Sequence, residues 1–215
     1  MKGILFSVRK SSIGLKRKDI VYFRHKYGIN LILMTTIFIG AVFGAICAGK
    51  ADKSLVDGLD IIFTSDFELR CNQTVLSSFI ASLTANFIFF TAIFLLGLSA
   101  WGGIGVPAVI AFKGFGIGLT GGYLYKYYSL TGVGFFLLVM LLGFVVSTLT
   151  LIFQGKLAIS FANSLFARVR GVSPDEAETL YKYIINSSFI LIVLSISSMA
   201  DAILNFLFAG IFTFS

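Results

Sequence analysis

The stretch VPAVIAFKGFGIGLTGGYLY, residues 106–125, is apolar enough to cross a bilayer, yet it holds one lysine and five glycines. A hydrocarbon core about 30 Å thick needs about 20 apolar residues in helical form. The run meets that length, and Lys113 falls inside it. It therefore predicts a transmembrane helix, over residues 104–125, that carries a charge at membrane depth.

The composition extends this interpretation to the whole chain. Of 215 residues, 57% are hydrophobic and only 13% are charged, more apolar surface than one small soluble core can bury. The alternating pattern of a transmembrane barrel is absent. We therefore predict an all-α polytopic membrane protein with five transmembrane helices. The four further apolar runs are residues 29–48, 76–98, 131–153 and 187–208.

Charge is distributed unevenly along the chain. Residues 1–28 hold eight Lys/Arg and one Asp, whereas residues 50–75 hold three Lys/Arg and five Asp/Glu. The positive-inside rule places the amino-terminal segment in the cytoplasm and the 50–75 loop outside. Basic and apolar residues mixed within residues 1–28 favour a segment on anionic membrane lipid over a nucleic-acid site. Residues 29–215 then form a single transmembrane domain.

The number of crossings depends on residues 131–166, which are apolar for longer than one helix needs. In the simpler interpretation a helix ends near Phe153 and a cytoplasmic amphipathic and loop segment follows over residues 155–186, giving five crossings and an outer carboxy terminus. The alternative breaks the run near Gly143 into a re-entrant half-helix and a full span, giving six crossings. Basic residues in the later loop favour five. Ser173 and Pro174 there begin a predicted short surface helix.

Three glycines define a small-residue face on the third span. Gly114, Gly118 and Gly122 recur every four residues, a spacing that lets a second backbone approach closely. The partner helix could belong to this chain or to another one. On this basis we expect a homodimer or a hetero-complex.

Polar residues at membrane depth are the candidate functional residues. A lysine at the bilayer centre costs about 2.5 to 3.5 kcal/mol on insertion scales, so Lys113 should face protein, unless its long side chain snorkels to the surface. Asp201 is the acidic residue at membrane depth. We expect Lys113 to be buried with Asp201 or Asn86 as its nearest polar partner.

The order of these motifs resembles the stage II sporulation protein M family. Asn86 opens an apolar span that ends in Leu-Gly, and after a short turn an apolar run leads into Lys113-Gly114 and glycine-rich helix. Asp201 stands where that family usually has Glu. The resemblance covers most of residues 29–204. It implies an engulfment protein of endospore-forming bacteria that acts with the wall-cutting sporulation proteins D and P, in the mother-cell or septal membrane.

The loop at residues 50–75 limits what the chain itself can catalyse. It has 26 residues and no histidine, too little to fold a hydrolase domain unaided. We therefore expect no enzymatic activity, cofactor or metal, and a membrane scaffold that localises wall-remodelling enzymes. The alternatives are a small permease that uses Lys113 and Asp201, and a family member with another membrane role. The acidic residues expected to dock partners are Asp52, Asp57, Asp60, Asp66 and Glu68.

Overall fold

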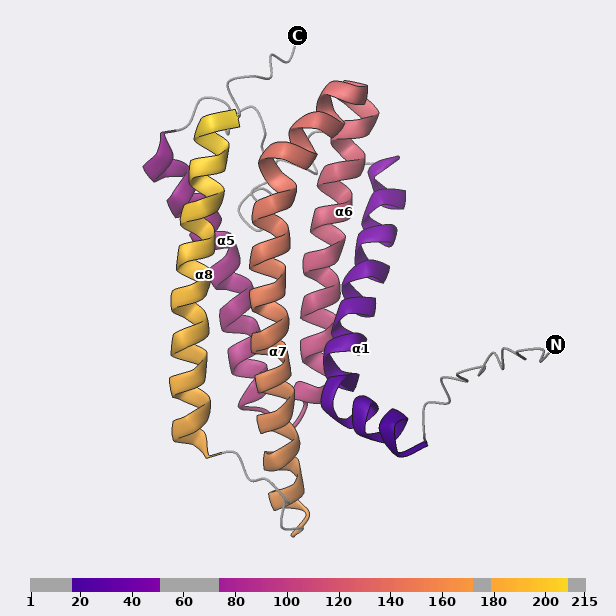
Figure 1. The fold of residues 1–215 in the computed structure, drawn as a ribbon, viewed down its shortest axis with the longest axis vertical. Coiled ribbons are helices and arrows are strands. Elements are labelled where there is room, and N and C mark those ends of the chain that lie inside the picture. The colour runs from indigo at the N-terminus through magenta and orange to yellow at the C-terminus, as the bar shows by residue number, and fades with distance from the viewer. Residues whose placement is uncertain (1–16, 51–73, 172–178, 209–215) are drawn as a thin grey trace, which may run out of the picture.

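A computed structural model of the protein describes residues 17–50, 74–171 and 179–208. The described residues are helical apart from short turns, and they contain no strand. Figure 1 shows the helices packed side by side as an elongated bundle. The helices are α1 (Arg17–Ala48), α5 (Val75–Gly97), α6 (Gly102–Phe135), the π-helix η1 (Phe136–Met140), α7 (Leu141–Val169) and α8 (Leu180–Phe208).

Four helical stretches in the described residues are long and apolar enough to cross a membrane. They are Gly28–Ala48, Val75–Gly97, Gly102–Val169 and Leu180–Phe208. At 1.5 Å per residue, α5 is about 35 Å long, enough for a hydrocarbon core of about 30 Å. The predicted all-α class is therefore confirmed, and the length and composition of the helices are compatible with a multi-pass membrane protein.

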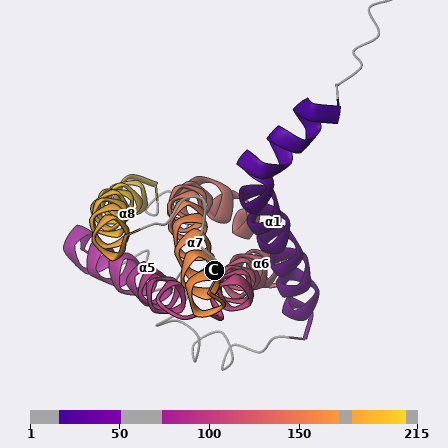
Figure 2. The same ribbon diagram turned by 90° about the horizontal axis from the view of Figure 1, so that it is seen from below.

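The 68-residue stretch Gly102–Val169 folds back on itself. Ser129, with φ 49° and ψ −128°, interrupts the helical backbone. The chain turns so tightly after it that a Cβ on Gly132 would collide with the carbonyl oxygen of Leu124. Figures 1 and 2 both show α6 and α7 side by side as a result. The reversal at Ser129 falls in the gap between the predicted spans 104–125 and 131–153. Gly143 lies inside α7, so the alternative break near that residue is not found.

Helix α7 also corrects the segment predicted over residues 155–186. The helix does not end near Phe153 but continues to Val169. Gly155, Ala158 and Ala162 face the protein core, because small residues let α7 pack closely against the ends of α5 and α6. Helix α8 begins at Leu180, so residues 180–186 are the start of a long helix. Ser173 and Pro174 lie outside the described residues.

Two hydrophobic clusters hold the helices together. The larger one joins all five α-helices through residues such as Leu33, Ile93, Val106, Leu151 and Leu194. The smaller one lies where the chain turns from α6 through η1 into α7. Helix α1 lies at the edge of the bundle against α6 (Figure 2).

The outer faces of the helices are apolar. Large side chains such as Phe38, Ile39 and Ile196 are about two-thirds exposed. An apolar surface of this extent is typical of helices that face lipid, because lipid tails replace the protein partners that a soluble core would need.

Candidate functional site: a buried polar network

Lys113 of α6 is buried and bound by a side chain of α5. Its Nζ donates a hydrogen bond of 3.0 Å to Asn86 Oδ1. Asn86 Nδ2 in turn donates to the Ser198 hydroxyl of α8 at 3.2 Å. Lys113 and Asn86 are only 4% and 5% exposed. The expected burial of Lys113, with Asn86 as a polar partner, is therefore confirmed.

Aromatic rings complete the surroundings of the Lys113 ammonium group. Its Nζ lies 4.8 Å from the ring centroid of Phe89 and 5.7 Å from that of Phe144. A ring face attracts a cation within about 6 Å, more strongly when the pair is desolvated. Helices α5 and α7 thus both contribute to holding the charge that α6 supplies.

Asp201 lies in the same region of the bundle. It is 6% exposed, and its carboxylate lies against Gly143, so that a Cβ on that glycine would collide with Asp201 Oδ1. Gly143 directly precedes Phe144, whose ring faces Lys113. Asp201 also follows Ser198 by three residues, which puts both on one face of α8. The fold therefore brings Asn86, Lys113 and Asp201 together from three helices.

Further polar pairs extend along the bundle-facing side of α8. Asn205 Nδ2 donates to the Ser78 hydroxyl at 3.0 Å, and Gln154 Nε2 donates to the Ser187 hydroxyl at 3.0 Å. Tyr183 donates its phenolic proton to the Phe94 carbonyl oxygen at 2.9 Å. We call the buried set the polar seam. Its members are Ser78, Asn86, Lys113, Gln154, Ser187, Ser198, Asp201 and Asn205.

The serines of the seam were not predicted from the sequence. Ser78, Ser187 and Ser198 each accept a hydrogen bond from a larger polar side chain on another helix. Serine is common in membrane helices and often bonds its own backbone, so a single serine carries little signal. Asp201 and Asn205 continue from Ser198 at helical spacing, and that spacing was the available signal for a polar face on α8.

The glycine face of α6 is covered by α1 of the same chain. A Cβ on Gly114 would collide with the Ile37 carbonyl oxygen, and one on Gly118 with that of Ala41. Gly122 lies against Ala45 and Ala48 in the same way. Helix α1 also contributes glycines to this contact, because a Cβ on Gly40 or Gly44 would collide with the carbonyl oxygen of Ala111 or Phe115, respectively. The close-packing face therefore has an intramolecular partner, and it no longer argues for a homodimer.

The remaining predicted residues belong to the 50–75 loop. Asp52, Asp57, Asp60, Asp66 and Glu68 lie outside the described residues. Within the described ranges, no group of three or more His, Cys, Asp or Glu side chains could hold a metal ion.

Chemically, the polar seam ties helices together. Each of these four hydrogen bonds joins two different helices, and three of them involve α8. Such bonds between membrane helices are worth about 0.6 kcal/mol on average and up to about 2 kcal/mol. Their geometry fixes the relative rotation and register of α5, α6, α7 and α8.

Comparison with protein-family models, curated proteins and solved structures finds no match for this chain.

Proposed function

We propose that this chain is a membrane scaffold without catalytic activity of its own, which holds wall-remodelling enzymes at the bacterial cell membrane during endospore engulfment. The observation that carries this proposal is the Lys113–Asn86–Ser198 chain of hydrogen bonds. It uses the intramembrane charge to join α5, α6 and α8. A charge bound in this way supports a structural role for the polar seam, which leaves the exposed segments to carry the function.

The choice of partners rests on the sequence resemblance. The motif from Asn86 to Gly122 is similar to that of the stage II sporulation protein M family, whose members act with the sporulation proteins D and P. The fold is consistent with that expectation in one respect, because the matching residues Asn86, Lys113 and Asp201 lie together. The proposal therefore names those enzymes, or similar wall-cutting ones, as partners, together with membrane lipid.

The proposal includes five crossings. Figure 1 shows α1, α6 and α8 running in one direction and α5 and α7 in the other. With residues 1–28 in the cytoplasm, as their basic charge favours, the 50–75 loop and the carboxy-terminal end of α8 are then outside. In this arrangement the acidic loop faces the compartment in which peptidoglycan is cut.

The test is affinity capture of the sporulation proteins D and P by the full chain in detergent. We expect capture by the wild type and reduced capture after the five loop carboxylates are changed to Asn or Gln. The matched control changes Asp19 and Asp175, acidic residues outside that loop, and should capture normally. Failure of the wild type to capture either enzyme would contradict the proposal.

A small permease is the second candidate. Buried polar atoms favour it, because Gln154 Oε1, Ser197 Oγ and Thr148 Oγ1 have no hydrogen-bond partner among the described residues. Together with Lys113 and Asp201 they supply polar groups at membrane depth, which often mark an ion or substrate path. Solute or proton flux into proteoliposomes that is lost in Lys113→Met would favour the permease over the scaffold.

A further inference from the structure

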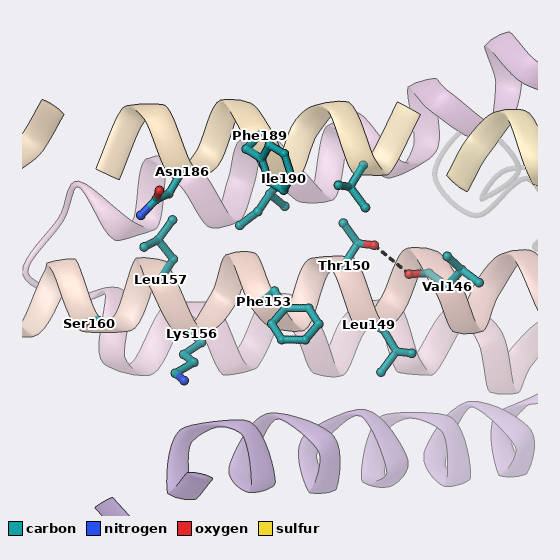
Figure 3. Close-up of a pocket in the computed structure, with 11 residues that line it drawn as sticks. Val146, Leu149, Thr150, Phe153, Lys156, Leu157, Ser160, Asn186, Phe189 and Ile190 are labelled. Atoms are coloured by element: carbon teal, nitrogen blue, oxygen red, sulfur yellow. Dashed lines mark hydrogen bonds between the residues drawn. The ribbon is translucent and has the colours of Figure 1, made fainter. Parts of the chain in front are cut away.

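A long groove follows the line between α7 and α8 on the outer surface of the bundle (Figure 3). It encloses about 520 Å³. Val146, Leu149, Phe153 and Leu157 line it from α7, and Phe189, Ile190 and Val193 line it from α8. Thr150 also lines it, but its hydroxyl donates to the Val146 carbonyl oxygen at 2.9 Å. The body of the groove is therefore apolar.

The remaining polar side chains are gathered at one end. Lys156, Ser160 and Asn186 line the groove there, and Figure 3 shows Lys156 and Asn186 at the same end. Lys156 is the one charged residue among the lining residues. The end of the groove thus offers a cation, a hydroxyl and an amide, while the rest offers hydrocarbon.

This polar end lies at the level of the turn between α5 and α6. A Cβ on Gly97, the last residue of α5, would come within 2.8 Å of the Ala158 Cβ. One on Gly102, the first residue of α6, would come within 2.7 Å of the Ala162 Cβ. Trp101 in the turn between them is 73% exposed, as is typical of tryptophan at a membrane surface.

The length of the groove matches one leaflet. Val146 precedes Lys156 by ten residues, which is about 15 Å along α7. The hydrocarbon core is about 30 Å thick, so one leaflet is about 15 Å deep. An acyl chain whose headgroup lies beside Lys156 would reach the midplane beside Val146.

We infer that this groove is a binding site for one anionic phospholipid of the leaflet on the Lys156 side. Its phosphate is bound by Lys156, with Ser160 and Asn186 as further polar residues at the same end of the groove, and an acyl chain fills the apolar part. The charge preference is assigned to Lys156, the charged residue among those that line the groove. The inference is independent of which enzymes the chain captures.

The test is native mass spectrometry of the purified full chain, titrated separately with phosphatidylglycerol and phosphatidylcholine. We expect one phosphatidylglycerol to bind more tightly than phosphatidylcholine. Lys156→Gln should lower the phosphatidylglycerol affinity about fivefold, the effect of about 1 kcal/mol for one lysine at an anionic surface. Its affinity for phosphatidylcholine should change little.

Two further variants make the result specific to the groove. Lys182→Gln removes an exposed charge at the same end of α8 that does not line the groove, and it should leave the preference intact. Val193→Trp fills the groove without changing charge and should weaken both lipids. Equal affinity of the wild type for both lipids, or equal losses in Lys156→Gln and Lys182→Gln, would overturn the inference. The lipid titrations contain no enzyme partner, so their outcome does not test the proposed scaffold function.

Discussion

At the scale of single residues, Lys113 determines how the centre of the bundle is built. A buried cation is tolerated when it is bound on several sides. Here Asn86 Oδ1 accepts a hydrogen bond from the Lys113 ammonium group, and the rings of Phe89 and Phe144 lie beside it. The burial of Lys113 and its contact with Asn86 were both predictable, because a lysine in an apolar span avoids lipid by facing polar groups of the protein. The role of Ser198 was not, since it depends on how α8 is rotated.

The first prediction concerns Lys113 and Asp201. Lys113→Met should lower the free energy of unfolding by about 3 to 5 kcal/mol, because it leaves a buried carboxylate uncompensated. Asp201→Leu should also destabilise, but the double variant should lose less than the sum of the two. Melting temperatures of the three variants in one detergent measure this. Strictly additive losses would show that the two charges do not interact.

The second prediction concerns Gly118. Even alanine there places a Cβ against the Ala41 backbone, so Gly118→Ala should separate α1 from α6 and cost about 1 to 3 kcal/mol of stability. Gly103→Ala is the control, since its Cβ would meet only Asn163 Oδ1 at 3.7 Å. Thermal melting should fall for the first variant alone. Light scattering should show the same mass for both, and a smaller mass for Gly118→Ala alone would reassign the face to an intermolecular contact.

At the scale of elements, the reversal at Ser129 organises the second half of the chain. It allows one helical stretch to supply two neighbouring helices, α6 and α7. The sequence around it, YYSLTG, holds no proline, and its glycine, Gly132, follows the break. The break falls within the predicted gap at residues 126–130, but which of these residues leaves the helical backbone was not predictable, whereas α5 was predicted to within one residue at each end. Its Thr74 cap and the Gly97 end are local signals, but the turn at Ser129 depends on tertiary packing.

The third prediction follows from the backbone of Ser129. Its φ of 49° is a conformation that glycine adopts without steric cost. Ser129→Gly should therefore raise the free energy of unfolding by up to about 1 kcal/mol. Thr131→Gly, two residues on in helical backbone, should lower it by up to about 1 kcal/mol. A melting temperature that falls equally in both variants would mean that the turn carries no strain.

At the scale of the whole molecule, the helices form one bundle in which the polar face of α8 binds α5 and α7. The all-α class and the grouping of Asn86, Lys113 and Asp201 were predictable from the sequence, because apolar runs and the polar residues within them are visible in the sequence itself. The helix that covers the glycine face was not predictable, because any helix with small residues could pack there. The continuation of α7 past Phe153 also depended on α5 and α6 being present to bury Ala158 and Ala162.

The fourth prediction is the topology. In a chain with Cys47 and Cys71 changed to serine, single cysteines are placed at Thr74, Arg170 and Ser215. With five crossings, an impermeant thiol reagent should label the cysteines at positions 74 and 215 in intact cells. It should label the cysteine at position 170 only after the membrane is permeabilised. Protection of the cysteine at position 215 in intact cells would indicate six crossings or another even number.

The most direct measurement compares two variants in the same capture of wall-remodelling enzymes by the full chain. One is Lys113→Met with Asp201→Leu, which removes the buried charges; the other changes Asp52, Asp57 and Asp60 to Asn in the 50–75 loop. For a scaffold, the first variant, once folded, should capture the enzymes as the wild type does, and the second should capture them poorly. Normal capture by the loop variant, together with loss in a correctly folded Lys113→Met/Asp201→Leu protein, would contradict the account.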